Sequence, residues 1–220
     1  MKQKTPAITP AHKIRSRDLS NTMVGYKINE YQLVLSPPET LRSKIQQVKH
    51  DFAETHENTT ALYSKPHIGL VNFAQYQMME DKIVNRLQTI AMGMPPVKIE
   101  LKDYGSFPAH TIYINITSKL PLQNLVKTVR TDAQRLMKLN DENKPYFIME
   151  PYITIARKLD PQQYEKGWLE YSHLHFTGRF IADAMLLLKR PVGEVKYEIV
   201  QRLEFKNMPV STTQGDLFSC

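Results

Sequence analysis

The stretch Pro151-Tyr152-Ile153-Thr154-Ile155-Ala156-Arg157 has an earlier counterpart, Pro66-His67-Ile68-Gly69-Leu70-Val71, and the pair decides the fold. Each stretch begins with a proline after a loop and is rich in β-branched or other apolar residues, which is typical of a strand. Aligned on the proline, the two read P-Y-I-T and P-H-I-G, 85 positions apart. We call them the motif strands. Their similarity predicts that the chain is a duplication centred on these two strands.

The elements around the motif strands recur in one order in both halves: strand, helix, motif strand, helix, strand. Apolar residues at helical spacing indicate the helices. In the first half we expect the elements at residues 31–36, 39–53, 62–73, 75–91 and 97–101, with a turn or bulge at 103–108. In the second half we expect them at 111–116, 121–139, 147–157 and 160–171, followed by strands at 175–188 and 195–205. This order predicts an α+β fold with duplicated strand-helix-strand-helix-strand lobes, two mainly antiparallel sheets that face a central cleft, and helices outside.

The predicted domain organisation has three parts. Residues 1–25 are expected to form a flexible basic arm, and 26–206 a single bilobal domain with lobes at about 30–109 and 110–206. Residues 207–220 are expected to form a loose tail. The arm contains a basic cluster with two interpretations, contact with RNA or simple solvation: Lys13, Arg15 and Arg17.

The composition bounds the class of protein. There are 29 Lys and Arg residues against 22 Asp and Glu, which gives a formal net charge of +7. A basic surface either serves solubility or attracts a polyanion such as RNA or a nucleotide. The single cysteine, Cys220, excludes a disulfide framework within the chain and favours a reducing, cytoplasmic location. No apolar run approaches the roughly 20 residues of a membrane span, so we expect no membrane association.

Residues two apart on a strand share a face, and this places polar side chains together in the predicted cleft. His67 and Gly69 point the same way in the first motif strand, as do Tyr152 and Thr154 in the second. An imidazole can exchange a proton with an attacking or leaving oxygen near neutral pH, and a threonine hydroxyl can donate to a phosphate oxygen. The pattern suits a phosphoester site that requires no metal. The alternative is that His67 is a hydrogen-bonded structural residue.

Other residues extend the predicted cleft. In the strand at 111–116 the isoleucines are expected to pack under helices, while the opposite face, with Thr111, Tyr113 and Asn115, lines the cleft. Arg157 has two interpretations, a phosphate ligand or a surface ion pair. Phe107 and His110 either edge the cleft or pack in a loop. The sequence Ser172-His173-Leu174-His175 offers a possible metal pair, but no third ligand has a recognisable spacing, so no metal site is expected.

The arrangement resembles the 2H phosphoesterases, which include the bacterial 2′-5′ RNA ligase-like proteins and the 2′,3′-cyclic phosphodiesterases. The resemblance covers about residues 30–206 and includes the order of the elements. Its residues are Lys65-Pro66-His67-Ile68-Gly69-Leu70, Glu150-Pro151-Tyr152-Ile153-Thr154-Ile155-Ala156-Arg157 and the closing Tyr197-Glu198-Ile199-Val200. In that family two histidines act as general base and general acid around a phosphate, and a hydroxyl two residues after each histidine holds the phosphate oxygens.

The resemblance implies catalytic roles for His67 and Thr154, and the chain departs from the family at two positions. Gly69 stands in place of the first hydroxyl, which removes a donor and opens space. Tyr152 stands in place of the second histidine, and because tyrosine has a reference pKa near 10 it is a poor general base at pH 7. It can still donate a hydrogen bond or act as an acid. Losing one of two proton-transfer partners costs about 10²–10⁴ in rate, so low activity is expected.

Three functions stay open from the sequence. The first is a 2′-5′ RNA ligase-like enzyme or cyclic phosphodiesterase that acts on RNA ends or small cyclic nucleotides without ATP, metal or other cofactor. The second is a non-catalytic RNA- or nucleotide-binding protein that uses the same cleft. The third is a structural protein that has kept the fold and lost the ligand. The residues expected to contact a substrate are Tyr152, Gly69, Tyr113, Asn115 and Arg157.

Overall fold

The structure is a computed structural model that describes residues 26–62 and 64–208. The predicted basic arm with its cluster at residues 13–17, the end of the predicted tail and Cys220 therefore lie outside the described residues. Within the described part the strands form two antiparallel sheets, as the sequence predicted.

The five-stranded sheet contains the first motif strand. Its strands are, in spatial order, β5 (Tyr146–Phe147), β2 (Ile68–Tyr76), β1 (Ile28–Leu35), β8 (Ala184–Pro191) and β9 (Glu198–Glu204). The first motif strand was predicted to begin at residue 62, but β2 begins only after Pro66, which has no backbone N–H to offer to a ladder. The preceding residues Thr59–Ala61 form a short 3₁₀ turn, η2.

The four-stranded sheet contains the second motif strand. Its strands are, in spatial order, β6 (Tyr152–Arg157), β4 (Thr111–Ile116), β3 (Val97–Phe107) and β7 (Thr177–Ala182). The stretch at 175–188 was expected to be one strand and is two, β7 and β8, which belong to different sheets. Likewise 147–157 is divided into β5 and β6, which also lie in different sheets.

Each sheet takes strands from both halves of the chain. β3, from the first half, lies between β4 and β7, and β8, from the second half, lies between β1 and β9. The two halves are therefore interlocked through their sheets. The boundaries predicted for the domain and its lobes stay a prediction.

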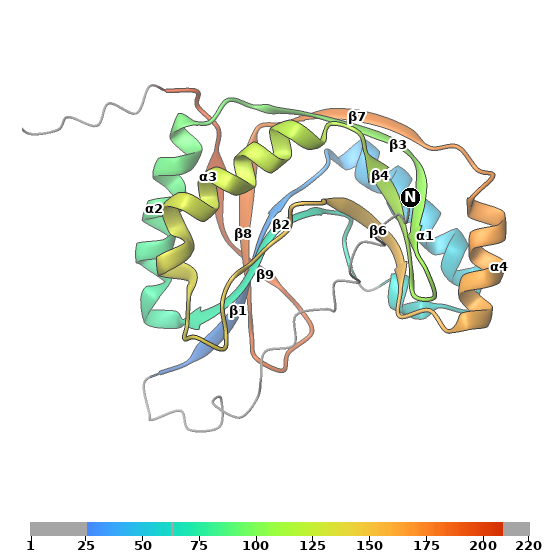
Figure 1. Ribbon diagram of the computed structural model, residues 1–220, viewed down its shortest axis with the longest axis horizontal. Coiled ribbons are helices and arrows are strands. Elements are labelled where there is room, and N and C mark those ends of the chain that lie inside the picture. The colour runs from blue at the N-terminus through green and yellow to red at the C-terminus, as the bar shows by residue number, and fades with distance from the viewer. Residues whose placement is uncertain (1–25, 63, 209–220) are drawn as a thin grey trace, which may run out of the picture.

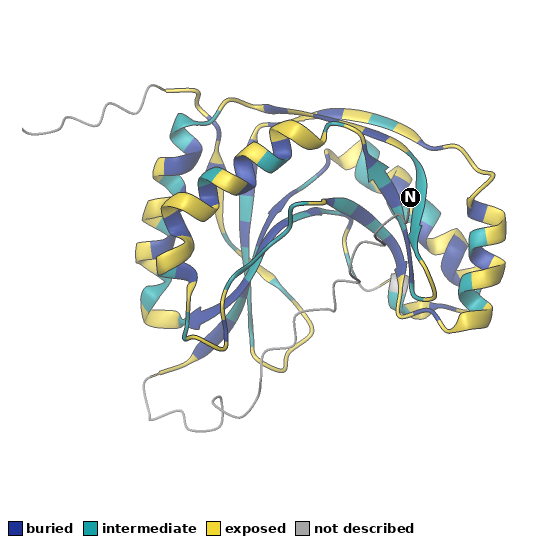
Figure 2. Cartoon of the chain, in the orientation of Figure 1, coloured by how far each residue is buried: buried dark blue, intermediate teal, exposed yellow. Residues whose placement is uncertain are grey.

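Four α-helices in the described residues cover the outer faces of the two sheets (Figure 1). α1 (Glu39–Thr55) and α4 (Pro161–Tyr171) pack against the four-stranded sheet. α2 (Glu80–Gly93), which follows the 3₁₀ turn η3 (Gln77–Met79), and α3 (Lys119–Met137) lie side by side against the five-stranded sheet. Figure 2 shows that the helices bury the side that faces the sheets and expose the outer side. The core is one continuous apolar cluster between helices and sheets.

Local sequence explains where several elements start and which faces they bury. Asp160 caps α4 by a reciprocal pair, in which its carboxylate accepts from the Gln163 N–H at 2.8 Å and the Gln163 side chain accepts from the Asp160 N–H at 3.3 Å. In β4 the isoleucines are buried, while Tyr113 and Asn115 are half-buried on the opposite face, as the alternation predicted. Thr111 is buried as well, contrary to the prediction that it lines the cleft.

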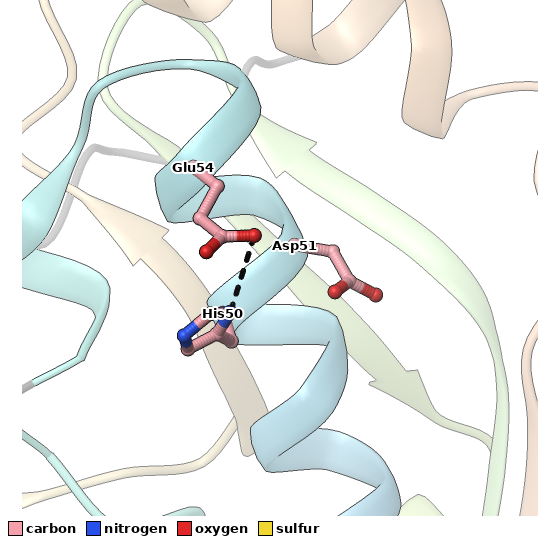
Figure 3. Close-up of side chains that lie close together, drawn as sticks. All are labelled: His50, Asp51 and Glu54. Carbon is pink, nitrogen blue, oxygen red and sulfur yellow. Dashed lines mark ion pairs between the residues drawn. The ribbon is translucent and has the colours of Figure 1, made fainter.

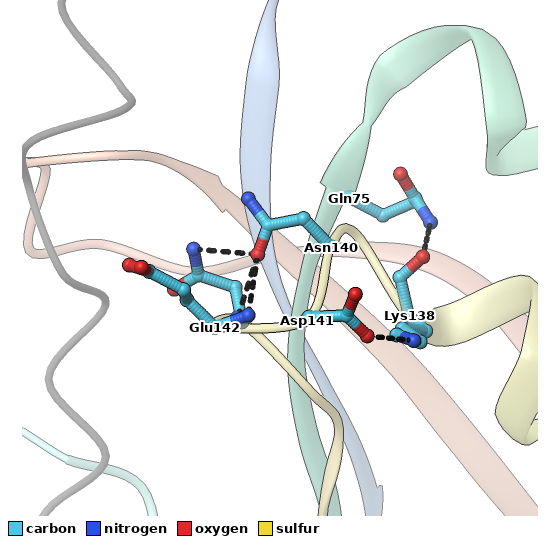
Figure 4. Close-up of polar contacts among 6 residues, drawn as sticks. Gln75, Lys138, Asn140, Asp141 and Glu142 are labelled. Carbon is cyan, nitrogen blue, oxygen red and sulfur yellow. Dashed lines mark hydrogen bonds and ion pairs between the residues drawn. The ribbon is translucent and has the colours of Figure 1, made fainter.

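A polar cluster fixes the segment that leads from α3 to the second motif strand (Figure 4). The buried Gln75 side chain donates to the carbonyl oxygens of Leu136 and Lys138 at 2.9 and 3.1 Å, which satisfies the open end of α3. The Asn140 side-chain oxygen accepts from the backbone N–H groups of Glu142 and Asn143 at 3.1 and 2.7 Å. These contacts direct the chain into β5. Because β5 pairs with β2, the residues that follow β5 also lie beside β2.

Candidate active site

A β-bulge interrupts the second motif strand at Ile155. Thr154 and Ala156 have partners in consecutive positions of β4, so Ile155 is the extra residue. Ile155 and Ala156 are both buried, and Arg157 is exposed. A bulge shifts the alternation of side chains by one position. Arg157 therefore shares a face with Thr154, although they are three residues apart.

The first motif strand carries a bulge at the equivalent position. Gly69 and Val71 pair with consecutive residues of β1, so Leu70 is the extra residue. Leu70 and Val71 are both buried, and Asn72 is half-buried on the face that Arg157 occupies in the other strand. The shared bulge supports the duplication. It also places Asn72 on the face of β2 that carries Gly69, a candidate site position that sequence reasoning missed, because nothing in a single sequence marks a bulge of this kind.

His67 lies directly before β2 and presents one nitrogen as a base. Its Nδ1 is 2.8 Å from the Lys65 carbonyl oxygen. A carbonyl can only accept, so Nδ1 carries the proton of the neutral ring and Nε2 carries the lone pair. Burial lowers the pKa of His67 below its ordinary value; the Lys65 hydrogen bond opposes this, and the positive charges of Lys49 and Arg157 add to it. The imidazole is therefore neutral at pH 7 and suited to accept a proton.

Arg157 faces His67 from the other motif strand. β2 and β6 approach within 8 Å between Cα atoms. The Arg157 side chain makes no ion pair within residues 26–62 and 64–208, so the surface ion pair, one of its two interpretations, is absent there. Burial lowers the pKa of Lys49, and the positive charge of Arg157 lowers it further. An exposed guanidinium beside a neutral imidazole is suited to bind an anion.

Lys49 is a buried cation behind this pair, and the sequence analysis missed it. It lies on α1 between the buried Ile45 and Phe52, and its side chain is 1% exposed. The Lys49 ammonium donates to the carbonyl oxygen of Ser64 and, at 2.9 Å, to the Ser64 hydroxyl. Burial lowers the pKa of Lys49 to about 8. A lysine on the apolar stripe of a helix was the signal that could have identified it.

Three aromatic rings form a cluster on the face that carries Thr154. The ring centroids lie 4.7 Å apart for Phe107 and Tyr113, 5.1 Å for Phe107 and Tyr152, and 4.8 Å for Tyr113 and Tyr152. Gly105 makes room for this cluster, because a Cβ atom there would lie 2.7 Å from the Tyr113 ring. Phe107, one of the two residues predicted to edge the cleft or pack in a loop, contacts predicted site residues.

Tyr152 cannot replace the second histidine as a base. Burial raises its pKa above the ordinary value, and the neighbouring Tyr146 and Tyr113 raise it further, while Arg157 lowers it slightly. Its hydroxyl is therefore protonated at neutral pH and available as a donor. The hydroxyls of Tyr152 and Thr154 make no hydrogen bond to other described residues, so both are free to contact a ligand.

Comparison with known proteins agrees with this architecture. Residues 37–194 match the model of the 2′-5′ RNA ligase superfamily. The chain belongs to this superfamily. A relative of Geobacillus kaustophilus (strain HTA426), named "Putative phosphoesterase GK0864", is 26% identical over 152 residues, which cover 67% of this chain and 81% of the relative. The family predicted from the motif strands is confirmed.

Solved structures share the fold of this superfamily member. E. coli LigT complexed with 3′-AMP has a TM-score of 0.54 at 14% identity, and the match covers 81% of this chain and 98% of LigT. The TT0787 protein of Thermus thermophilus has a TM-score of 0.56 at 13% identity, and the match covers 80% of this chain and 98% of that protein. The predicted α+β fold is confirmed.

The chain departs from the superfamily motif at Gly69 in a way that the sequence did not indicate. Gly69 was expected to open space, but a Cβ atom at this position would lie 2.9 Å from the Ile148 Cδ1 atom. The Ile148 N–H donates to the Leu70 carbonyl oxygen at 2.9 Å, which holds this segment against β2. The expected space is filled because the segment after β5 covers the strand at this point.

Three other histidines in the described part of the chain lie apart from His67 in separate contacts. His175, in the possible metal pair, is exposed and its Nδ1 lies 3.1 Å from Asp103. His110 Nδ1 lies 2.6 Å from the Thr111 hydroxyl, and its Nε2 is buried without a hydrogen-bond partner in the described residues.

A third histidine belongs to a surface cluster on α1. His50, Asp51 and Glu54 form the one group of three possible metal ligands among the described residues, and all three are exposed (Figure 3). His50 and Glu54 form an ion pair of 3.4 Å at (i, i+4) spacing, an ordinary surface contact.

No helix within the described residues has the length and apolarity needed to cross a membrane.

Proposed function

We propose that this protein is a phosphoesterase of the 2′-5′ RNA ligase-like type that opens or forms a cyclic or 2′-linked phosphodiester at an RNA end or in a small nucleotide. The observation that carries the proposal is the state of His67: its Nδ1 donates to the Lys65 carbonyl at 2.8 Å, and its lowered pKa leaves Nε2 free as a base. A general base must be unprotonated at the working pH to accept a proton, and the unprotonated form of histidine is the neutral imidazole.

In the hydrolytic direction, His67 Nε2 takes a proton from the attacking water. A new bond forms between the water oxygen and phosphorus as the bond from phosphorus to the ribose 2′ or 3′ oxygen breaks. The leaving oxygen takes a proton from the Tyr152 hydroxyl or from solvent. Arg157 and Thr154 hold the non-bridging oxygens, where their positive charge and hydroxyl stabilise the developing negative charge. In ligation a ribose 5′-hydroxyl takes the place of water: its oxygen bonds to the phosphorus of a 2′,3′-cyclic phosphate and gives its proton to His67, while the bond from phosphorus to the 3′ oxygen breaks and that oxygen takes a proton as above. This exchange of ester bonds uses no ATP or metal in our proposal.

A nucleotide is the favoured substrate because aromatic rings lie beside the basic groups. Nucleobases stack on aromatic side chains, and Phe107, Tyr113 and Tyr152 provide such a surface on the face that also carries Asn115. E. coli LigT, whose fold this chain shares, has been crystallised with 3′-AMP, with NADP+ and with phosphate. We extend this ligand class to the present chain. The cytoplasmic location stays a prediction.

Turnover of 2′,3′-cyclic AMP by the wild-type protein and by His67→Ala tests the proposal. We expect the substitution to lower kcat/KM by about 10²–10⁴, because the general base is lost. The matched control is His50→Ala, which removes an exposed histidine from the outer face of α1. Equal turnover by the wild type and His67→Ala would show that the assignment of the base is wrong.

The second candidate function is nucleotide or RNA binding without catalysis. It is favoured by Tyr152, which occupies the position of the second histidine and has a raised pKa. This function predicts affinity for a short RNA that falls as the salt concentration rises, with no turnover. Binding that does not respond to salt would count against it, and turnover that depends on His67 would favour the enzyme.

A further inference from the structure

Lys49 is the one charged residue that is buried within the described part of the chain. Burying an ammonium group disfavours the folded state unless charged or polar partners compensate. No carboxylate lies within ion-pair distance of Lys49 among the described residues. Its polar contacts are instead the carbonyl oxygen and hydroxyl of Ser64. A buried cation of this kind is better explained by the site beside it than by stability.

The contacts of Lys49 lead directly to His67. Lys49 anchors Ser64, and the next residue, Lys65, supplies the carbonyl that accepts from His67 Nδ1 at 2.8 Å. The short segment 64–67 is thus fixed at both ends. Lys49 of α1 holds Ser64, and the backbone carbonyl of Lys65 holds the His67 ring. Pro66 within it restricts the backbone further. Together these contacts direct the imidazole.

The charge of Lys49 acts at the same place. The charged or titratable groups that act on Lys49 and His67 are these two and Arg157 of β6. Both cations oppose protonation of the His67 ring, and together they provide an excess of positive charge that an anion would neutralise.

We propose that Lys49 is a positioning residue, which anchors the segment that carries His67 and supplies, with Arg157, a second positive charge beside the phosphate. The proposal rests on the proposed function for the identity of the ligand. The chemistry that it recognises is the phosphate group of a nucleotide or RNA end. Lys49 acts through Ser64 and His67 and through the field of its charge, because its side chain is buried.

The experiment compares Lys49→Met, Lys49→Arg and a control in the full chain. The control is Lys127→Met, because Lys127 is exposed on α3 and forms no ion pair with described residues. The first readout is an NMR titration of the His67 imidazole without substrate. We expect the His67 pKa to rise in Lys49→Met, to stay low in Lys49→Arg and to be unchanged in Lys127→Met. An unchanged His67 pKa in Lys49→Met would overturn the proposal.

The second readout is the affinity for inorganic phosphate at pH 6.5. We expect Lys49→Met to weaken binding about tenfold, the usual effect of losing one charge-assisted contribution, with Lys49→Arg near the wild type. If Lys49→Met does not fold, Lys49→Gln takes its place, because it removes the charge and keeps a donor for Ser64. We expect it to raise the His67 pKa and to weaken phosphate binding in the same way. Wild-type affinity in the uncharged variant would overturn the proposed role of the charge.

These results are separable from the proposed function. The titration and the phosphate affinity need no turnover, so they test Lys49 even if 2′,3′-cyclic AMP is not a substrate. If His67→Ala left turnover unchanged while the His67 pKa still rose in Lys49→Met, the proposed enzyme would be wrong, whereas the link between Lys49 and His67 would be supported.

Discussion

At the scale of single residues, His67 and Tyr152 occupy equivalent positions in the two motif strands, and their surroundings shift their pKa values in opposite directions. His67 has a lowered pKa and a free Nε2, which suits a base. Tyr152 has a raised pKa, mainly because it is buried, which suits a hydrogen-bond donor. Two groups with pKa values moved apart are the usual arrangement for a base and an acid in one site. Tyr152 is the less effective of the two in proton transfer at neutral pH, because its pKa is raised.

Tyr152→His should therefore raise activity. An imidazole at this position would donate a proton to the leaving oxygen far more readily than a phenol, and we expect kcat/KM for 2′,3′-cyclic AMP to rise about 10–100-fold. Tyr152→Phe is the matched variant, which keeps the ring and removes the donor, and should lower activity while nucleotide binding persists. Equal activity of all three proteins would show that this side chain takes no part in the reaction.

Lys49 should make the fold less stable than it could be, and the effect should depend on pH. Its folded-state pKa of about 8 lies below the 10.5 of an unperturbed lysine, so between these values the unfolded state binds more protons and stability rises with pH. Below about pH 8 the full penalty applies. Lys49→Met should then increase the free energy of unfolding at pH 7 by about 2 kcal/mol, after allowing for the lost contacts to Ser64.

Urea denaturation of both proteins at pH 7 and pH 10 measures this effect. The difference between wild type and Lys49→Met isolates the titration of Lys49 from that of the other lysines and tyrosines, and it should shrink at pH 10. A Lys49→Met protein that is less stable than the wild type at pH 7 would identify Lys49 as a stabilising residue and contradict this account.

At the scale of elements, the paired bulges decide which side chains meet. In a regular strand without the bulge at Ile155, alternation would place Arg157, three residues after Thr154, on the opposite face. With it, Arg157 lies on the same face as Thr154 and near His67. The bulge thus converts a strand-end arginine into a residue that faces the other motif strand.

Arg157→Ala tests this geometry. Because Arg157 is exposed and has no ion pair within the described residues, the substitution should leave the melting temperature within about a degree of the wild type. It should nevertheless weaken phosphate binding about tenfold, because a charge-assisted contact is lost. Arg179→Ala, an exposed arginine on β7, is the control. Unchanged affinity in Arg157→Ala would mean that the side chain does not face the phosphate.

The elements also show what could be read from the sequence. The helices and the isoleucine face of β4 followed from periodicity, because burial imposes a regular spacing. His67, Thr154 and Arg157 were predicted as site residues from the motif strands, and their roles stay a prediction. Lys49 and Ile148 were not, since their roles depend on packing between segments far apart in the chain. Asn72 was missed because a one-residue bulge leaves no mark on periodicity.

At the scale of the whole molecule, the exchanged strands join the two halves. β3 completes the sheet that holds the second motif strand, and β8 completes the sheet that holds the first. Each motif strand pairs with a strand of its own half, β1 or β4, but its sheet loses β8 or β3 if the other half unfolds. The proposed site depends on this, because His67 and Arg157 come from different sheets and are proposed to act on the same anion.

The molecule should accordingly unfold in a single transition. Trp168, the single tryptophan, lies on α4 against the four-stranded sheet, and its fluorescence reports that side of the molecule. Far-UV circular dichroism reports both sides. We expect the two urea curves to coincide, as for a two-state domain. A fluorescence transition that is separated from the dichroism transition would show that the two sheets unfold independently.

The central claim is that a neutral His67 is the base of a phosphoester reaction. Its most direct test is the pH dependence of kcat/KM for 2′,3′-cyclic AMP, which reports the ionisation of the free enzyme. We expect activity to rise with pH through a value below the ordinary 6.5 of histidine, since the His67 pKa is lowered. We also expect this step to be absent from the residual activity of His67→Ala. The same step in His67→Ala, at undiminished activity, would contradict the claim.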